Sequence, residues 1–244
     1  MYILFLVAAL AGSYFMGGLN GALITSRLVY GEDVRKHGSG NPGLTNFYRT
    51  YGARAIFLLI LIDVIKTALP VIVTGMIFSN AFTFFSVEER ILVGRTLGGL
   101  FAMVGHAYPC LYGFKGGKGV LSGGTVALFL DVRVGMIVWG VFFLAVILTK
   151  YVSLGSILAG LFFPISFLIF RANPWATLIS ALCGAFLIFR HRENVVRLCK
   201  GEERKLSRRK KQKTTEAPTE APAAETAEPP TSGEAPSSDE EEVQ

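Results

Sequence analysis

The sequence predicts an all-α, polytopic integral membrane protein with about seven transmembrane helices, and three observations support this fold class. Of its 244 residues, 51% are hydrophobic and only 17% are charged, and the mean hydropathy is +0.47. Soluble domains usually contain about 25% charged residues, so the deficit favours a membrane environment. Several apolar runs are long enough to cross a bilayer, and residues 1–189 contain only 13 Lys/Arg and 6 Asp/Glu.

Five apolar runs predict membrane-spanning helices. A spanning helix needs about 20 mostly apolar residues, because it rises 1.5 Å per residue through about 30 Å of hydrocarbon. The runs that reach or approach this length are 2–23, 56–78, 134–148, 154–170 and 175–189. Two weaker stretches, 91–104 and 120–130, are each expected to form a short helix or half of a re-entrant hairpin. Small residues in these stretches should let helices pack closely; they are Gly98, Gly99, Gly123 and Gly124.

The basic residues predict how the chain is oriented. Cytoplasmic loops of membrane proteins carry an excess of Lys and Arg. With seven crossings and an outside N-terminus, the inside segments are 27–54, 105–118, 149–153 and 190 onward, and they hold most of the basic residues. The outside loops keep only Arg90, Arg133 and Arg171, which are partly offset by nearby acidic residues. We therefore expect the N-terminus outside and the C-terminus inside.

The composition changes twice near the C-terminal end. Residues 190–213 contain 11 Lys/Arg and 3 Asp/Glu, whereas residues 214–244 contain 9 Asp/Glu and no basic residue. A basic segment beside a span is attracted to anionic lipid, and a Pro/Thr/Glu-rich tail cannot bury enough apolar area to offset its ordering entropy. We therefore expect a transmembrane domain over 1–203, a basic juxtamembrane segment over 204–213 and a disordered acidic tail over 214–244.

Three polar segments on the predicted inside face carry the candidate chemistry. In the first segment, 36–49, glycines allow the backbone to turn, and several side chains can form hydrogen bonds. Thr45 and Arg49 are one helical turn apart, so both could face one ligand. The candidate ligands of this segment are Ser39, Asn41, Thr45, Asn46 and Arg49. The alternative is a Gly/Asn/Pro turn with a helix cap.

The second segment, 105–119, predicts an anion site. Consecutive glycines flanked by lysines can direct backbone N–H groups at a phosphate, and a helix that opens near residue 120 would add its positive dipole end. The candidate residues are Lys115, Gly116, Gly117, Lys118 and Gly119. The segment is not a Walker A loop, because Tyr112 and Gly119 stand where that motif needs Gly and Ser/Thr. A flexible basic loop is the alternative.

The third segment follows the last apolar run and supplies a candidate proton acceptor. His191 and Asn194 are three residues apart and share a helix face, and Arg197 lies one turn further along. A histidine can take or hold a proton near neutral pH. His37 and His106 compete for this role, and a basic stop-transfer flank is the alternative. The three cysteines lack metal or redox spacing, and no metal site is expected.

In combination, the three segments resemble the motifs of a known family. The strings Gly38-Ser-Gly-Asn-Pro-Gly-Leu-Thr-Asn46 with Arg49, Gly105-His-Ala-Tyr-Pro109 with Phe114-Lys-Gly-Gly-Lys-Gly-Val120, and His191-Arg-Glu-Asn194 are similar to those of the bacterial acyl-phosphate:glycerol-3-phosphate acyltransferases, the PlsY family. Residues 150–155 resemble a further short family segment. The resemblance covers about residues 1–203. Leu44, Tyr108 and the Leu121-Ser122 pair depart from the usual family residues, and none of these changes removes a polar group.

The resemblance implies a seven-helix enzyme of the bacterial plasma membrane whose site opens to the cytoplasm. It implies acyl phosphate and glycerol 3-phosphate as substrates, no cofactor, no metal, no nucleic acid, and a setting among membrane lipids. Functional coupling to an acyl-phosphate-producing enzyme is a further expectation. Ser39, Arg49, Lys118, His191 and Asn194 would form the substrate site, Gly116, Gly117 and Gly119 would hold a phosphate, and Ser153 would lie nearby.

A mechanism can be built from these groups. Both substrates carry phosphate, so Arg49, Lys115 and Lys118 would gather two anions. The acyl phosphate is already activated, so the glycerol hydroxyl can attack its carbonyl without a covalent enzyme intermediate, and positioning and charge stabilisation would supply the rate. The proton would go to His191 or to a substrate phosphate oxygen, and the sequence leaves both open.

Two other classes of function remain as alternatives. A transporter of small phosphorylated compounds would also use glycines, lysines and intramembrane polar residues such as Asn20, Asp63 and Lys66, although the last two can simply pair inside the helix. A membrane scaffold would not need three concentrated polar segments. A CoA-dependent acyltransferase is excluded, because Asp should follow its histidine by five residues. Those positions hold Pro42, Leu111 and Val196.

Overall fold

The structure is a computed structural model that describes residues 2–81, 85–171 and 173–206. The described residues form ten α-helices and two 3₁₀ turns, and they contain no strand. The helices are α1 (Tyr2–Gly18), α2 (Gly21–Tyr30), α3 (Leu44–Tyr51), α4 (Ile56–Phe78), α5 (Val87–Ala107), α6 (Val120–Leu130), α7 (Val132–Thr149), α8 (Val152–Arg171), α9 (Pro174–Arg190) and α10 (Arg192–Cys199). The turns η1 (Val34–Lys36) and η2 (Cys110–Tyr112) lie in the loops. The predicted tail, 214–244, and residues 207–213 of the basic segment lie outside the described residues.

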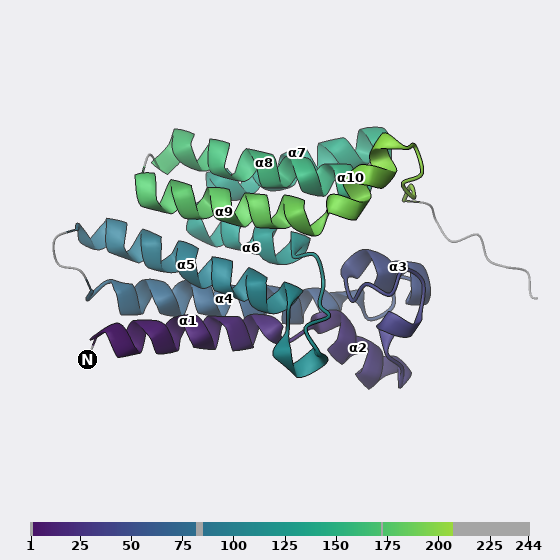
Figure 1. The fold of residues 1–244 in the computed structure, drawn as a ribbon, viewed down its shortest axis with the longest axis horizontal. Helices are drawn as coiled ribbons and strands as arrows, with labels where there is room; N and C mark the ends of the chain where they lie inside the picture. The colour runs from purple at the N-terminus through teal and green to yellow at the C-terminus, as the bar shows by residue number, and fades with distance from the viewer. Residues whose placement is uncertain (1, 82–84, 172, 207–244) are drawn as a thin grey trace, which may run out of the picture. The chain divides into compact units, whose positions relative to one another are not determined.

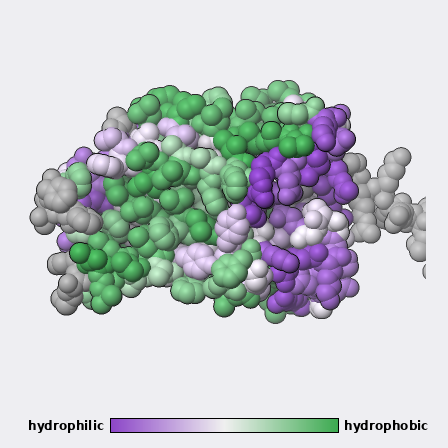
Figure 2. Space-filling view, viewed as in Figure 1, coloured by the Kyte–Doolittle hydropathy of each residue, from purple (hydrophilic) through white to green (hydrophobic). Residues whose placement is uncertain are grey.

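The long helices α1, α4, α5, α8 and α9 lie side by side, while α2, α3 and α10 gather at one end of the bundle (Figure 1). Apolar side chains cover the flanks of the bundle, and the end that carries α2, α3 and α10 is strongly hydrophilic (Figure 2). Phe57 and Leu148 illustrate the flanks, with 77% and 73% of their surface exposed. Such a large exposed apolar surface is expected where lipid is the solvent.

Four segments among the described residues are long and apolar enough to span a membrane, the first of them Ile3–Tyr30, which joins α1 and α2. The number is five if α9 and α10 count as one bent span. α5 is 21 residues long but begins with charged residues, and α6 is an apolar helix of only 11 residues. At 1.5 Å per residue, α6 is about 16 Å long, which is roughly half of the hydrocarbon thickness. All seven predicted stretches are helical, and the exact number of crossings stays a prediction.

Two of the predicted helices differ clearly in their bounds from the structure. The predicted first span, 2–23, is interrupted, because α1 ends at Gly18 and Asn20 caps the new helix α2 by accepting a hydrogen bond from the Leu23 N–H. α5 begins at Val87, one turn before the predicted residue 91, because Ser86 and Glu89 form a capping box. Hydropathy alone predicts neither boundary, because both depend on hydrogen bonds between side chains and the backbone.

The predicted close packing is confirmed at Gly98, Gly99 and Gly124, whereas a Cβ atom on Gly123 would meet only Met103, at 3.4 Å. A Cβ atom on Gly98 would lie 2.1 Å from Thr74 Oγ1, and one on Gly124 would lie 2.3 Å from Trp139 Cζ2. Both distances are far below van der Waals contact, so these positions require glycine. The glycines let α5 approach α4 and let α6 approach α7, and this close packing fixes where the loops at the hydrophilic end emerge.

Candidate active site

Four segments that are distant in sequence meet at the hydrophilic end of the bundle. They are the 37–46 loop with α3, the 113–119 loop before α6, the start of α8, and the corner between α9 and α10 with the segment up to residue 206. Between them, they contain every candidate site residue predicted from the sequence. The detailed contacts show which of those residues the fold brings together.

The centre of the site is a hydrogen-bonded chain through Asn194. Lys118 Nζ donates to Asn194 Oδ1, and Asn194 Nδ2 donates to Glu203 Oε1 at 2.7 Å. Arg197 Nε donates to the other carboxylate oxygen of Glu203 at 2.8 Å. Burial lowers the pKa of Lys118, and the charge of Arg197 lowers it further. The predicted residues Lys118 and Asn194 are therefore in direct contact, whereas Glu203 was not among the predicted site residues.

His191 lies at the bend between α9 and α10, where the helix axis turns by 58°. Its Nδ1 is 2.8 Å from the carbonyl oxygen of Leu187, and because a carbonyl only accepts, Nδ1 must carry the proton. The side chain is buried, and burial is the main reason that the pKa of His191 is lowered to about 4. The ring is therefore neutral at pH 7, with an unprotonated Nε2 that can accept a proton.

Arg49 projects from α3 toward the C-terminal segment of the described chain. Its Nη2 donates to the carbonyl oxygens of Arg204 at 3.3 Å and Lys205 at 3.4 Å. Partial burial lowers the pKa of Arg49, and the neighbouring Arg204 adds to that effect. The Leu206 N–H donates to the Lys150 carbonyl at 2.7 Å, so residues 203–206 connect α3 with the start of α8.

Ser153 lies on the same side of the site, at the start of α8. Its side chain is buried, and its hydroxyl is close to Glu203 but makes no hydrogen bond to the residues described here. Burial alone would raise the pKa of Glu203, but the bonds from Asn194 and Arg197 and the proximity of Ser153 bring it below its usual value. The fold therefore places Ser153 beside Glu203, the carboxylate that Asn194 bonds.

Asn46 organises the 37–46 loop from inside. Its Oδ1 accepts from the Ser39 N–H at 2.9 Å, and its Nδ2 donates to the carbonyls of Val34 at 3.2 Å and His37 at 3.0 Å. Asn46 is therefore fully engaged in holding the backbone. The hydroxyl-bearing Ser39 is exposed on this loop, and the other two candidates are partly exposed, namely Asn41 and Thr45.

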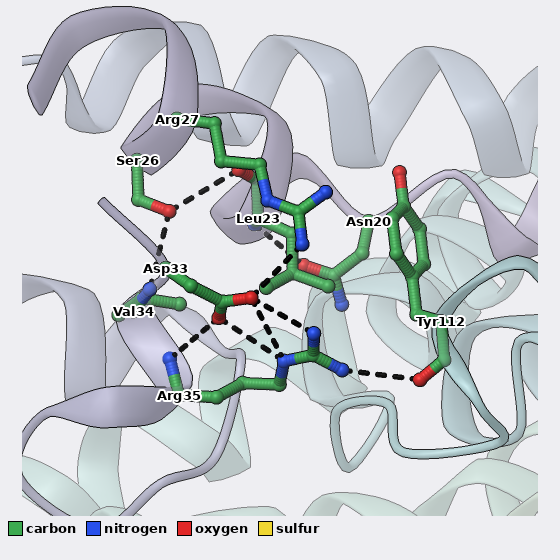
Figure 3. Close-up of polar contacts among 8 residues, drawn as sticks. All are labelled: Asn20, Leu23, Ser26, Arg27, Asp33, Val34, Arg35 and Tyr112. Carbon is green, nitrogen blue, oxygen red and sulfur yellow. Dashed lines mark hydrogen bonds and ion pairs between the residues drawn. The ribbon is translucent and has the colours of Figure 1, made fainter. Parts of the chain in front are cut away.

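An ion-pair cluster that the sequence analysis missed supports the same loop (Figure 3). Asp33 accepts from Arg27 Nη2 at 2.9 Å and from Arg35 Nη2 at 2.8 Å, and these bonds hold the pKa of Asp33 well below its usual range. Arg35 Nη1 also donates to the Tyr112 carbonyl at 3.0 Å. The cluster thus ties the residues just before the first polar segment to the second segment. The close spacing of Asp33 and Arg35 in the sequence was the available signal.

The glycines of the second segment pack tightly against the end of α5. The Gly116 N–H donates to the Ala107 carbonyl at 3.2 Å, and the Gly117 N–H donates to the His106 carbonyl at 3.1 Å. Two of the three N–H groups of the predicted anion cradle, those of Gly116 and Gly117, are thus engaged within the protein, so this conformation does not offer them to a phosphate. Gly119 has a φ of +86°, which favours glycine just before α6.

The two lysines of this segment differ, because Lys118 points to Asn194 while Lys115 is exposed. Arg190 is a further residue that the sequence analysis missed. Its Nη2 donates to the Gly117 carbonyl at 3.1 Å, and its guanidinium lies 4.6 Å from the centre of the Tyr108 ring. Arg190 therefore joins the end of α9 to the loop that carries Lys118.

The other two histidines lie apart from Asn194. His37 is partly exposed, and its Nε2 pairs with Glu32 Oε2 at 2.8 Å. His106 is buried at the end of α5 and contacts Lys66, with 2.7 Å between its Nδ1 and the Lys66 Nζ. Of the three candidate proton acceptors, only His191 lies within one helical turn in sequence of Asn194, which bonds both Lys118 and Glu203.

Comparison with known proteins gives a consistent result. The profile of the glycerol-3-phosphate acyltransferase family matches residues 7–201. The glycerol-3-phosphate acyltransferase of Finegoldia magna is 36% identical over 209 residues, which is 85% of this chain and 100% of that protein. The Bacillus subtilis protein of the same name is 34% identical over 198 residues, covering 80% of this chain and 94% of that protein.

The fold is also similar to that of solved structures. The glycerol 3-phosphate form of PlsY, an integral membrane glycerol 3-phosphate acyltransferase, has a TM-score of 0.71 and 29% identity, over 83% of this chain and 96% of that one. Its lysophosphatidic acid form has a TM-score of 0.70 and 27% identity, over 83% and 95%. With its polar motifs joined at one end of an apolar helical bundle, the chain belongs to the PlsY family of glycerol-3-phosphate acyltransferases.

Proposed function

We propose that the protein transfers a fatty acyl group from acyl phosphate to the 1-hydroxyl of glycerol 3-phosphate. The products would be lysophosphatidate and inorganic phosphate, in the first acylation step of phospholipid synthesis. The observation that carries the proposal is the cluster of Lys118, Asn194 and Arg197 beside a neutral His191, because it combines anion-binding groups with a proton acceptor. Related PlsY structures are described as glycerol 3-phosphate and lysophosphatidic acid forms, which fits this acceptor and this product.

The helix arrangement supports a topology of seven crossings formed by α1, α4, α5, α6, α7, α8 and α9. This path brings the starts of α4, α6 and α8 and the ends of α5, α7 and α9 to the cytoplasmic side, with the N-terminus outside and the C-terminus inside. At the opposite end, Arg171 approaches Glu88 at 3.4 Å and Asp131 at 3.6 Å, so the end of α8, the start of α5 and the turn between α6 and α7 lie together. The protein would lie in the plasma membrane of a bacterial cell, and the basic end that holds the site would face the cytoplasm.

The described contacts support distinct roles for the site residues. Arg49 and Lys118 would bind the phosphates of the two substrates, and the exposed Lys115 would add positive charge at the entrance. Asn194 would hold Lys118, and Ser39, Asn41, Thr45 and Ser153 would supply hydrogen bonds to the acceptor or the phosphates. Asn46 would act by holding the loop, and Gly116, Gly117 and Gly119 by allowing the Lys118 loop to lie against α5.

In the reaction, the 1-hydroxyl oxygen of glycerol 3-phosphate would attack the carbonyl carbon of the acyl phosphate. The new ester bond forms, the bond between the carbonyl carbon and the phosphate oxygen breaks, and phosphate leaves with that electron pair. The hydroxyl proton goes either to His191 Nε2 or to a substrate phosphate oxygen. Because the donor is already activated, the protein's part is to hold two anions in contact and to stabilise the developing negative charge.

The protein would have three parts and would depend on a neighbouring enzyme for its donor. The chain would consist of a membrane acyltransferase domain over 1–203, a basic segment over 204–213 beside anionic lipid, and an acidic tail over 214–244. The donor would come from an acyl-phosphate-producing enzyme, with which functional coupling is expected. The acyl chain would lie between helices, among apolar side chains.

The test uses purified full-length protein in detergent or lipid, supplied with glycerol 3-phosphate and either acyl phosphate or acyl-CoA. We expect lysophosphatidate from acyl phosphate only. His191→Ala should lose most of the activity, whereas His37→Ala, the same change at a partly exposed histidine that pairs with Glu32, should retain it. Both variants need a melting curve to show that they are folded.

The outcomes separate the competing functions. Product from acyl-CoA alone would overturn the proposed donor. If folded protein makes no product from either donor, the proposed acyl transfer is wrong, and uptake of radiolabelled glycerol 3-phosphate into proteoliposomes becomes the assay for a transporter.

A further inference from the structure

A buried ion pair lies in α4, away from the candidate substrate-binding groups. Lys66 Nζ and Asp63 Oδ1 are 2.8 Å apart, and only 1% and 4% of their side chains are exposed. Lys66 is ten residues into α4, about 15 Å along the helix from its start. Ionisable residues at such a depth in a membrane helix are costly to bury, and they are commonly retained for function.

The lysine of this pair supports the loop that carries Lys118. Lys66 Nζ is 2.7 Å from His106 Nδ1, and because an ammonium group only donates, Nδ1 is the acceptor. The imidazole ring packs directly against Gly117, where a Cβ atom would lie 2.2 Å from His106 Nε2. The backbone carbonyl of His106 accepts from the Gly117 N–H. Lys66 therefore fixes the ring on which the residue before Lys118 rests.

The aspartate supports the other polar loop. Asp63 Oδ1 accepts from the Gly21 N–H at 3.0 Å, which anchors the first turn of α2. The preceding residue, Asn20, is fully buried, and its Nδ2 donates to the Pro42 carbonyl at 3.1 Å. Pro42 belongs to the loop that carries Ser39 and Asn46. Asp63 is thus connected to the first polar segment through two consecutive residues at the break between α1 and α2.

A third contact joins the same part of α4 to the start of α6. Thr67 Oγ1 lies 3.2 Å from Ser122 Oγ and also donates to the Asp63 carbonyl at 2.9 Å. Ser122 is in the first turn of α6, immediately after the loop of Lys118. One turn of α4, residues 63–67, therefore contacts α5 and α6, which flank the Lys118 loop. The same turn contacts α2, which precedes the 37–46 loop.

We propose that Asp63 and Lys66 are positioning residues for the acyl transfer. By holding His106 and the start of α2 at the same time, the pair sets the distance between the Lys118 loop and the 37–46 loop, and thus the distance between the two phosphate sites. This inference rests on the proposed function for what the two loops bind. A pair that served helix packing alone would need no bonds to the elements that precede both loops.

The test replaces both charges together, because removing one would leave the other buried without a partner. The variant Asp63→Asn/Lys66→Met removes the pair at nearly constant side-chain size. We expect a folded protein whose KM for glycerol 3-phosphate rises about tenfold or more and whose kcat falls. The matched control is Asp131→Asn/Arg133→Met, which also removes an ion pair but at the opposite end of the bundle, and it should leave both constants unchanged.

A double-mutant cycle distinguishes positioning from a general loss of structure. In a Lys118→Met background, the Asp63→Asn/Lys66→Met change should raise KM by less than twofold further, because one of the two phosphate sites whose separation the pair sets is already lost. Wild-type kinetics in the folded pair variant, or a full tenfold effect in the Lys118→Met background, would overturn the inference.

A second pair of variants tests the same inference if Asp63→Asn/Lys66→Met does not fold. His106→Asn keeps an acceptor close to the position of Nδ1 and should retain part of the activity, whereas His106→Leu, which cannot accept from Lys66, should resemble the pair variant. Equal kinetics for the two His106 variants would contradict the inference.

A readout without turnover separates this inference from the proposed function. Trace acetylation with acetic anhydride, read by mass spectrometry, reports how reactive Lys118 is in the complete protein. The reactivity of Lys118 relative to Lys115 should change at least twofold in Asp63→Asn/Lys66→Met and stay constant in Asp131→Asn/Arg133→Met. If wild-type protein forms no lysophosphatidate, the proposed function fails, but the labelling ratio still tests the positioning. An unchanged ratio would refute the positioning even in an active enzyme.

Discussion

Lys118 and Asn194 are 76 residues apart, and the ammonium group of the first donates to the side-chain oxygen of the second. An ammonium group only donates, so this contact fixes which end of the Asn194 amide faces the loop. The amide nitrogen must then face Glu203, and it donates to that carboxylate at 2.7 Å. One asparagine thus links the cation of the loop before α6 to the carboxylate of the C-terminal segment.

Lys118→Met should raise the KM for glycerol 3-phosphate by about 10- to 100-fold, since a hydrogen bond from a charged group contributes about 1.5–3 kcal/mol. Steady-state kinetics with purified protein would measure it. Lys115→Met is the matched control in the same loop, and its effect should be clearly smaller, because Lys115 is exposed. An equal effect at both positions would contradict the identification of Lys118 as the inward-facing lysine.

His191 should make the stability of the protein depend on pH. The pKa of this residue is lowered to about 4 in the folded protein, against about 6.5 in an unfolded chain. Between these values, the unfolded chain binds more protons, so stability is complete above pH 6.5 and falls as the pH decreases toward 4. The loss is on the order of 3 kcal/mol. Thermal melting in detergent at pH 7 and pH 4.5 would measure it.

His191→Asn is the control for that pH series. An asparagine can still donate to the Leu187 carbonyl but does not titrate, so the variant should lose visibly less stability over the same pH interval. Identical melting shifts in the two proteins would show that other groups cause the acid sensitivity. For the activity of the wild type, His191 should already be unprotonated at pH 6, so its titration should not limit the rate between pH 6 and pH 8.

Gly117→Ala should damage the site through sterics. The added methyl group would lie 2.2 Å from His106 Nε2, so the loop or the ring must shift. We expect a loss of at least about 2 kcal/mol in stability, as for an overpacked core, with a higher KM for glycerol 3-phosphate. Gly140→Ala, where no atom lies within 4 Å of the new methyl group, should be neutral or slightly stabilising in the same melting experiment.

Glu203→Gln should destabilise the α9–α10 corner. The carboxylate accepts from Asn194 and Arg197, and only 9% of its side chain is exposed, so the change weakens two charge-assisted bonds at about 1.5–3 kcal/mol each before compensation. The neighbouring Glu202→Gln is the control, because Glu202 is exposed. Equal melting temperatures for the two variants would contradict a structural role for Glu203.

Hydropathy and motif spacing predicted the helices of this molecule and the end of the bundle at which the polar segments meet. The seven apolar or weakly apolar stretches are all helical, because lipid leaves a membrane segment few alternatives to an intrahelical bond for each N–H and C=O. The gathering of Arg49, Lys118 and Asn194 at one end was predictable as well, since their segments alternate with spans and must emerge on the same side.

Individual contacts were not predictable in the same way. The break at Asn20, the bond between Lys66 and His106, and the return of Glu203 to Asn194 each join residues whose proximity depends on the packing of several helices. The role of the Gly116 and Gly117 N–H groups was also not predictable. The same glycine-rich sequence can direct its N–H groups at a ligand or at the end of a helix.

The contacts of residues 204–206 have a practical consequence for making shortened versions of this protein. A chain cut after residue 203, where the sequence alone suggested the domain ends, would remove both carbonyl partners of Arg49 and the N–H that bonds the Lys150 carbonyl. A stop codon after Leu206 would keep all three bonds. For expression and crystallisation, we therefore expect the 1–206 protein to melt at a higher temperature than the 1–203 protein, and to be the better starting point.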